Sequence, residues 1–278
     1  MKLVLTGAAG RLGSYLREPL AKMADQLTST DIVPDIGKLY AGERYMRADL
    51  ADLSAVQEVL NGADMVVHFG AVGDEAPFDQ ILSANIVGAY NIWEAAYIKG
   101  LKRVVYASSI HAVGMHANAD KIDTDAPHRP DTYYGLAKCF AEDLGRMYWD
   151  KRQLEATCLR IFSCAQVTSP RSLATWLSYD DLIQLVTQAI NTPDTGFHVV
   201  YGVSNNDRSP LDNADAAAKI GYVPKDNAEV FAEEILANAE PVGAKDLAQT
   251  RLGGPFAIVP LGQSGLATMK IVDDRKKT

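Results

Sequence analysis

Three residues of this chain have the types and the spacing for the oxidation of an alcohol. Tyr134 and Lys138 lie four residues apart in TYYGLAK, and Ser109 precedes them in VVYASSIHAVG. A tyrosine is a poor base because its free pKa is about 10, but a lysine one helical turn away favours the phenolate. Tyr134 would then accept a hydroxyl proton near neutral pH, while Ser109 would hydrogen-bond the same oxygen. The three residues predict a catalytic triad, provided that the fold supplies a hydride acceptor.

A Tyr-x-x-x-Lys pair also occurs by chance on helices, where it is a surface pair without a function. Ser109 favours the catalytic interpretation because it ends the predicted strand KRVVYASS, at the edge of a parallel sheet where ligands bind. Tyr133 is not the candidate base, because the residue four positions after it is Ala137.

The N-terminus predicts the hydride acceptor, because TGAAGRLG follows a first predicted strand and opens a first predicted helix. Gly7 would permit a tight turn, Gly10 a close approach to a pyrophosphate, and Gly13 close packing of a helix whose N-terminus attracts anions. Asp31 ends the second predicted strand, where it would accept a hydrogen bond from the ribose 2′-hydroxyl of NAD and repel the 2′-phosphate of NADP. An ordinary turn and a solvated acid are the alternatives for these two features.

Two later segments end at the same sheet edge. Asp49 and Leu50 would flank the adenine, and HFGAV, residues 68–72, would pass beneath the pyrophosphate. His68 has a second interpretation, as a buried histidine with satisfied hydrogen bonds, because its neighbours are apolar.

The strands and helices that must position these residues are predicted to alternate along the chain. Short β-rich runs separated by amphipathic stretches predict an α/β fold of the Rossmann type, a doubly wound parallel sheet with helices on both faces. The strands are expected at KLVLT, LTSTDI, ERYMRADL, ADMVVHFG, KRVVYASS and EATCLRIFS, and the first helix at RLGSYLREPLAKMA. The helical period is clearest in residues 79–99 and 131–150.

The chain is expected to form a single domain, 1–278, with three regions. Residues 1–165 would form mainly the NAD-binding core. Beyond it, turn-rich segments such as CAQVTSPRS and RLGGPFAIVPLG predict substrate-binding loops, so residues 166–262 are assigned mainly to a small C-terminal substrate-binding region. Residues 263–278 are assigned to a tail without a role, and its polar end is expected to fray.

The composition restricts the partners. With 278 residues, 47% of them hydrophobic, the chain can bury a large core. Its formal charge of −8 argues against binding to nucleic acid or an anionic membrane, and an anionic substrate would need a local cation. Neither a signal peptide nor a membrane span is predicted.

The three cysteines, Cys139, Cys158 and Cys164, have no metal-like spacing, so we predict no metal site. An odd number without a secretory signal indicates reduced thiols and a cytoplasmic protein.

These motifs resemble those of the short-chain dehydrogenase/reductase superfamily in its extended branch, through TGAAGRLG, NIVGAYNIWEAA, VVYASSIHAVG and YGLAK. PFDQIL, RPDTYYGLAKCFAEDLGRMY, RIFSC, TWLSYDD and GYVPKDNAE are similar to uronate dehydrogenases and extend the resemblance over most of the chain. The resemblance implies NAD-dependent oxidation of galacturonate or glucuronate at C1 to an aldarolactone. The expected partner is thus a small uronic acid, and we expect a homo-oligomer.

The resemblance also assigns roles. Tyr134 would take the proton of the anomeric hydroxyl, Lys138 would hold the nicotinamide ribose, and Ser109 would orient the reacting oxygen. Arg171, in SPRSLATW, matches the carboxylate-binding arginine of the family and would engage the carboxylate bidentately. Without the resemblance it would be read as a solvated loop arginine.

His111, Ser163 and Phe256 match further sugar-contacting positions. The chain departs from the family pattern at two others. Gly73 stands where the family has a serine, so that one sugar hydrogen bond is either missing or supplied by Asp74, and Ile110 replaces an asparagine. The predicted substrate contacts are Gly73, Ser109, Ile110, His111, Tyr134, Ser163, Arg171 and Phe256. The predicted cofactor contacts are Gly7, Gly10, Arg11, Leu12, Gly13, Asp31, Asp49, Leu50, Phe69, Gly70, Ala71, Asn85, Tyr134, Lys138 and Ile161.

Two other functions use the same motifs. A sugar-nucleotide epimerase or dehydratase of the extended branch shares the triad, but it usually has a larger C-terminal domain. A non-catalytic NAD-binding sensor often lacks the tyrosine or the lysine, and this chain has both.

Overall fold

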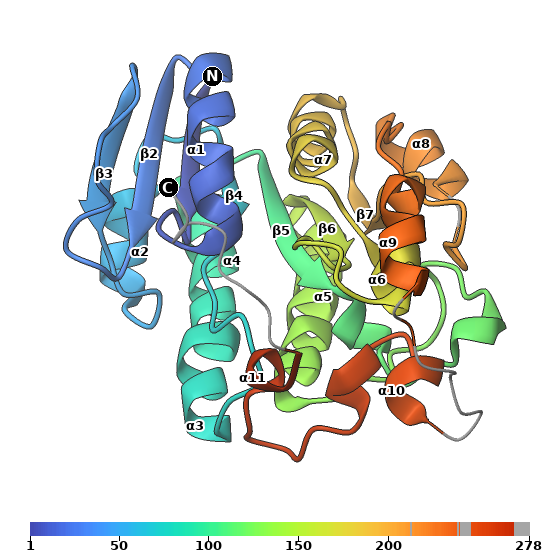
Figure 1. The fold of residues 1–278 in the computed structure, drawn as a ribbon. Helices are drawn as coiled ribbons and strands as arrows, with labels where there is room; N and C mark the ends of the chain where they lie inside the picture. The colour runs from blue at the N-terminus through green and yellow to red at the C-terminus, as the bar shows by residue number, and fades with distance from the viewer. Residues whose placement is uncertain (212, 238, 240–245, 270–278) are drawn as a thin grey trace.

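The computed structural model describes residues 1–211, 213–237, 239 and 246–269. Its centre is a seven-stranded parallel sheet in the order β3-β2-β1-β4-β5-β6-β7 (Figure 1). The strands are β1 (Lys2–Thr6), β2 (Gln26–Asp31), β3 (Glu43–Arg47), β4 (Met65–His68), β5 (Arg103–Ser109), β6 (Glu155–Ile161) and β7 (Phe197–Gly202). The first six were predicted, and β7 was not. The strand order reverses between β1 and β4, which opens a crevice for a ligand at their carboxyl ends.

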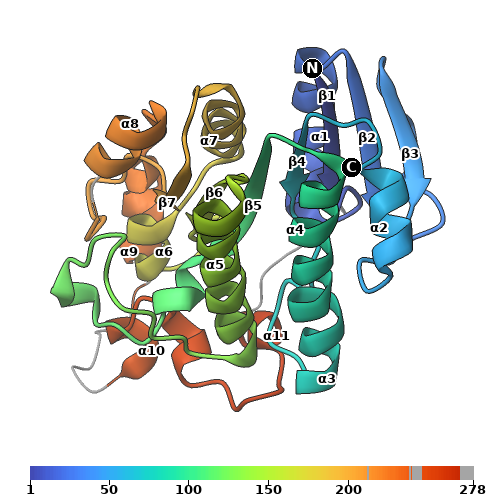
Figure 2. The ribbon, with the colours of Figure 1, turned by 180° about the vertical axis from the view of Figure 1, so that it is seen from behind.

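Helices cover both faces of the sheet, as a doubly wound fold requires. Those bordering the sheet are α1 (Arg11–Met23) and α7 (Tyr179–Asn191) on one face (Figure 1), and α2 (Leu53–Val59), α4 (Gly88–Lys99) and α5 (Tyr133–Arg152) on the other (Figure 2). The shorter helices are α3 (Phe78–Ile81), α6 (Pro170–Thr175), α8 (Ala214–Ile220), α9 (Ala232–Ala237), α10 (Leu247–Thr250) and α11 (Gly265–Met269). Within the described ranges, no helix has the length and apolarity that crossing a bilayer requires.

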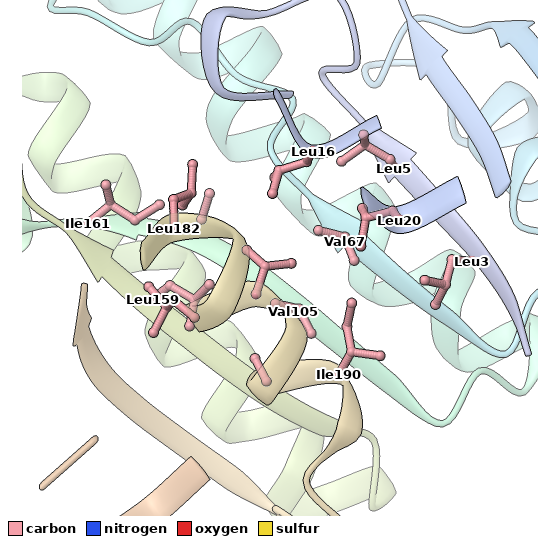
Figure 3. Packing of buried hydrophobic residues seen from close by; sticks show 14 of the residues in the cluster. Leu3, Leu5, Leu16, Leu20, Val67, Val105, Leu159, Ile161, Leu182 and Ile190 are labelled. Carbon is pink, nitrogen blue, oxygen red and sulfur yellow. The ribbon is translucent and has the colours of Figure 1, made fainter. Parts of the chain in front are cut away.

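The alternation of side chains along each strand produces two cores. In β1, Leu3 and Leu5 face α1 and α7, whereas Val4 faces the helices on the opposite side. Figure 3 shows the first of these cores, where Leu16 of α1 and Leu182 of α7 pack over the sheet. Because strands buried on both faces are nearly continuous apolar runs, they were recognisable in the sequence.

The two long predicted helices differ from the structure in detail. The stretch predicted at 79–99 is helical but changes type, since the π-helical turn Leu82–Val87 separates α3 from α4. The helix predicted at 131–150 begins two residues later, because the Thr132 hydroxyl accepts a hydrogen bond from the N–H of Gly135 and caps α5.

The glycine loop between β1 and α1 has the geometry that its sequence predicted. Gly7 has a φ of +71°, in the left-handed region that favours glycine. A Cβ atom on Gly13 would lie 2.0 Å from the carbonyl oxygen of Gly7, so the helix can approach the turn only without a side chain there. A larger residue at either position would displace the loop.

His68 is a buried histidine with a satisfied hydrogen bond, as its second interpretation held. Its side chain is 2% exposed, and Nδ1 lies 2.7 Å from the hydroxyl of Thr6. The same hydroxyl accepts the N–H of Gly70, so it joins the end of β1 to the loop after β4. Burial lowers the pKa of His68 from 6.5 to about 3.

His68 should therefore make the protein less stable in acid. The unfolded chain binds a proton as the pH falls below about 6.5, and the folded chain does so only near 3. In this window the unfolded state carries more protons, so stability is present above pH 6.5 and is lost toward pH 3. We expect the free energy of unfolding of the wild type to fall by up to about 1.4 kcal/mol per pH unit more steeply than that of His68→Asn. Urea titrations from pH 7 to pH 4 measure this, and parallel curves would contradict it.

Candidate active site

A cavity of about 580 Å³ lies at the carboxyl ends of the strands. Its walls come from the glycine loop, the ends of β4, β5 and β6, the start of α5, the loop before α6 and the C-terminal segment. The predicted residues that line it are Gly7, Gly10, Arg11, Leu12, Gly13, Phe69, Ala71, Gly73, Ser109, Ile110, His111, Tyr134, Lys138, Ile161, Ser163, Arg171 and Phe256. The fold thus brings the predicted substrate contacts and most of the predicted cofactor contacts to one cavity.

The triad meets at this cavity because β5 ends where α5 begins its path along the sheet. Ser109 is the last residue of β5, while Tyr134 and Lys138 occupy successive turns of α5. The ammonium group of Lys138 lies 5.2 Å from the centre of the Tyr134 ring and donates a hydrogen bond of 2.7 Å to the carbonyl oxygen of Ala107. A substrate hydroxyl in the cavity can reach the Ser109 and Tyr134 hydroxyls together.

The expectation that Tyr134 is a base near neutral pH is not met by the chain alone. Burial raises the pKa of Tyr134 to about 12, although the side chain of Ser109 opposes this. Burial also lowers the pKa of Lys138 to about 7, so near neutral pH the lysine is only partly charged. The tyrosine therefore needs an additional positive charge beside it before it can act as a base.

The glycine loop has the features of a dinucleotide site. Gly10 caps α1 without a side chain, and no acid occupies the first turn, so the N–H groups there face the cavity unopposed. Asp31 accepts a hydrogen bond of 2.9 Å from the N–H of Ala9, which places its carboxylate beside the loop at the end of β2. These residues fit a pyrophosphate and an adenosine ribose.

Five predicted cofactor contacts lie outside the cavity lining, namely Asp31, Asp49, Leu50, Gly70 and Asn85. Leu50 and Gly70 are packed together, since a Cβ on Gly70 would lie 2.6 Å from Cδ1 of Leu50. Asn85, in the π-helical turn, uses its amide to bind both the N–H and the carbonyl oxygen of Val72. In the structure it therefore holds the loop that leads to Gly73.

Arg171 is held at the cavity without a carboxylate partner among the described side chains. Nη1 donates to the Ser163 hydroxyl at 3.3 Å, and Nη2 donates to the carbonyl oxygen of Leu252. Nε is buried and has no hydrogen-bond partner within the described part of the chain. Burial lowers the pKa of Arg171 to about 10, which leaves it charged at neutral pH. A partly buried cation of this kind, with one N–H group unpartnered, fits an anionic ligand.

The two departures from the family pattern have different structural outcomes. A Cβ on Gly73 would meet no atom within 4 Å, so the position borders open space. Ile110 is 3% exposed and packs in a hydrophobic cluster, which leaves its backbone as the part that can face a ligand. Asp74 lines the cavity, but its carboxylate accepts hydrogen bonds from the hydroxyl of Ser264 and the N–H groups of residues 265 and 266.

The sequence interpretation missed the contribution of residues 263–269. Leu266, in the region assigned to a tail without a role, lines the cavity. Glu75, which is 2% exposed, accepts the N–H of Gly262 at 2.7 Å and that of Tyr134 at 2.9 Å. The adjacent acids in the loop that follows β4 were a usable signal for Asp74 and Glu75. No local pattern indicated their partners, and residues 270–278 lie outside the described residues.

Comparisons with known proteins agree over most of the chain. A model of the NAD dependent epimerase/dehydratase family matches residues 3–175. The uronate dehydrogenase of Pseudomonas putida is 43% identical over 92% of this chain and 96% of its own length. A uronate dehydrogenase variant from Agrobacterium tumefaciens, solved in complex with NAD, has a TM-score of 0.88 at 40% identity and covers 93% of this chain and 97% of its own. The glucuronic acid dehydrogenase of Chromohalobacter salexigens has a TM-score of 0.89 at 42% identity, with the same coverage of 93% and 97%.

Proposed function

The chain belongs to the NAD dependent epimerase/dehydratase family and, within it, to the uronate dehydrogenases, and on this premise we propose that it oxidises a hexuronic acid at C1. The substrate is D-galacturonate, D-glucuronate or both in the pyranose form, the product is the aldarolactone, and the cofactor is NAD. Uronate and NAD⁺ become lactone, NADH and one proton, which balances the reaction.

The residues of this chain divide the work. Ser109 holds the anomeric oxygen, and Tyr134 takes its proton as the carbonyl bond at C1 forms. Lys138 lies beside the phenol and stabilises its anion when charged. When bound, NAD supplies the hydride acceptor and a positive nicotinamide ring, which favours the phenolate that the buried chain alone disfavours.

Arg171 is the observation that carries the assignment to a sugar acid. The triad serves many alcohols, whereas a partly buried guanidinium with an unpartnered Nε at the same cavity selects an anion. Because the overall charge of −8 repels anions, an anionic substrate needs a local cation such as Arg171.

A spectrophotometric assay of NADH formation with galacturonate and with glucuronate tests the proposal. We expect turnover with at least one of them and none with UDP-glucose. Interconversion of UDP-sugars without net NADH would identify a sugar-nucleotide epimerase instead. Tight NAD binding without turnover of any sugar would identify a sensor.

We also propose a homo-oligomer that forms through α4 and α5. These neighbouring helices expose large apolar side chains, among them Tyr90, Tyr97, Leu136 and Met147, the last of which is 50% exposed. Exposed apolar surface on adjacent helices is typical of a protein interface. Light scattering should give a multiple of the 30.1 kDa chain mass, and Leu136→Glu should shift it toward the monomer.

A cytoplasmic location is also part of the proposal. Cys139, Cys158 and Cys164 are all buried and unpaired, as expected for a protein kept in a reducing compartment.

A further inference from the structure

Asp131 is a buried carboxylate beside the sugar end of the cavity. Its side chain has no exposed surface, and Oδ2 lies 2.8 Å from Nδ1 of His111. Oδ1 accepts a hydrogen bond of 2.9 Å from the hydroxyl of Thr132, the residue that caps α5. Because a carboxylate only accepts hydrogen bonds, Nδ1 must carry the hydrogen, and in the neutral imidazole Nε2 is then an acceptor.

The remaining ring nitrogen of His111 is available to a ligand. Nε2 has no hydrogen-bond partner among the residues that the structure describes, and the His111 side chain, 14% exposed, lines the cavity. Phe256 stacks on the imidazole with ring centres 4.1 Å apart, and the Tyr134 ring lies edge-on at 5.7 Å. Phe256 thus fixes one face of the His111 ring and Asp131 fixes Nδ1. The ring lies beside Tyr134, the proposed base.

The backbone around Asp131 leaves room for no other side chain. A Cβ on Gly114 would lie 2.0 Å from Oδ2 of Asp131, and one on Gly253 would lie 1.8 Å from it. The N–H of Gly253 donates to the carbonyl oxygen of Gly114 at 2.9 Å, so the two segments close over the carboxylate. Two segments far apart in sequence therefore both lack a side chain where the carboxylate lies.

We propose that Asp131 is a positioning residue that fixes the tautomer and the direction of His111, so that Nε2 accepts a hydrogen bond from a sugar hydroxyl. The choice of a sugar as ligand rests on the proposed function, whereas the tautomer does not. Asp131 thereby determines which hydrogen-bonding character the cavity presents beside Tyr134. If Asp131 only held the segments of Gly114 and Gly253 together, the tautomer of His111 would not depend on the charge of residue 131.

A double-mutant cycle separates the two roles. We expect Asp131→Asn to lower kcat/KM for the uronate by about 10- to 100-fold, the range for residues that orient a ligand-binding histidine, with KM for NAD within about twofold. In the His111→Ala background the same substitution should cost almost nothing, because its effect passes through His111. Additive losses would overturn the proposal. Asp143→Asn is the matched control, because the carboxylate of Asp143, on α5, lies 3.5 Å from His128 but is 75% exposed and outside the cavity.

The nitrogen NMR spectrum of ¹⁵N-histidine-labelled protein tests the tautomer without any turnover. His111, assigned by loss of its signals in His111→Ala, should be protonated at Nδ1 in the wild type and should shift toward Nε2 protonation in Asp131→Asn. A wild-type His111 protonated at Nε2 would refute the proposal even if the variant fails to fold. A fixed Nδ1–H tautomer in a protein that oxidises no uronate would refute the substrate assignment and leave the role of Asp131 intact.

Discussion

Tyr134→Phe is expected to lower kcat by 10²- to 10⁴-fold, the usual loss when a positioned proton acceptor is removed. The variant keeps the ring that packs against Ala137 and Ile81 and loses only the hydroxyl that faces Ser109. Folding and NAD binding should therefore remain. Stopped-flow and steady-state measurements of NADH formation, with NAD affinity determined by calorimetry, measure the two effects separately.

Tyr133→Phe is the matched control for this variant. Tyr133 precedes the base in the same helix and packs edge-on against Phe78, 5.3 Å between ring centres, outside the cavity lining. Its substitution should change kcat by less than about twofold, since it contributes no group to the proposed reaction. Undiminished turnover in Tyr134→Phe would remove Tyr134 from the mechanism.

The second large effect is expected at Arg171. Arg171→Ala should raise KM for the uronate by roughly 10- to 100-fold, because charge-assisted hydrogen bonds of about 1.5–3 kcal/mol are lost. Arg171→Lys should recover only part of this, since an ammonium group cannot bind a carboxylate bidentately. NAD affinity should change little in either variant. Initial rates over a range of uronate and NAD concentrations measure these values.

Arg208→Ala supplies the comparison for Arg171. Arg208 forms a pair with Glu229 on the surface, where 43% of its side chain is exposed, and such pairs contribute little. We expect its kinetics to equal those of the wild type. If Arg171→Ala weakened NAD and uronate binding equally, Arg171 would be a structural arginine and not the carboxylate site.

The parts of the site that the sequence predicted are those governed by local rules. Gly7 and Gly13 lie in the strand-to-helix turn and the first helical turn after it. Gly7 has a positive φ, and a Cβ on Gly13 would clash with the carbonyl oxygen of Gly7, so both reasons for glycine are local. Ser109 could be placed because the carboxyl ends of parallel strands share one edge. Tyr134 and Lys138 could be paired because one helical turn separates them.

The parts that the sequence did not predict depend on contacts between distant segments. Asp131 reads as the first residue of a helix, and only the fold shows that Gly114 and Gly253 enclose it. The pKa of Tyr134 was not predicted because burial, which depends on the whole fold, is the largest influence on it. The π-helical turn that carries Asn85 has the composition of an ordinary helix.

The hydrogen bonds that Glu75 makes to Gly262 and Tyr134 have a consequence for the order of assembly. The nucleotide loop, the triad and six strands are complete in the chain by Ile161, whereas the segment that covers the cavity follows much later in the sequence. Because chains fold from the N-terminus as they are synthesised, a nascent protein can acquire its dinucleotide and be stabilised by it before it can retain a sugar. Each molecule would then bind NAD before its substrate site is complete.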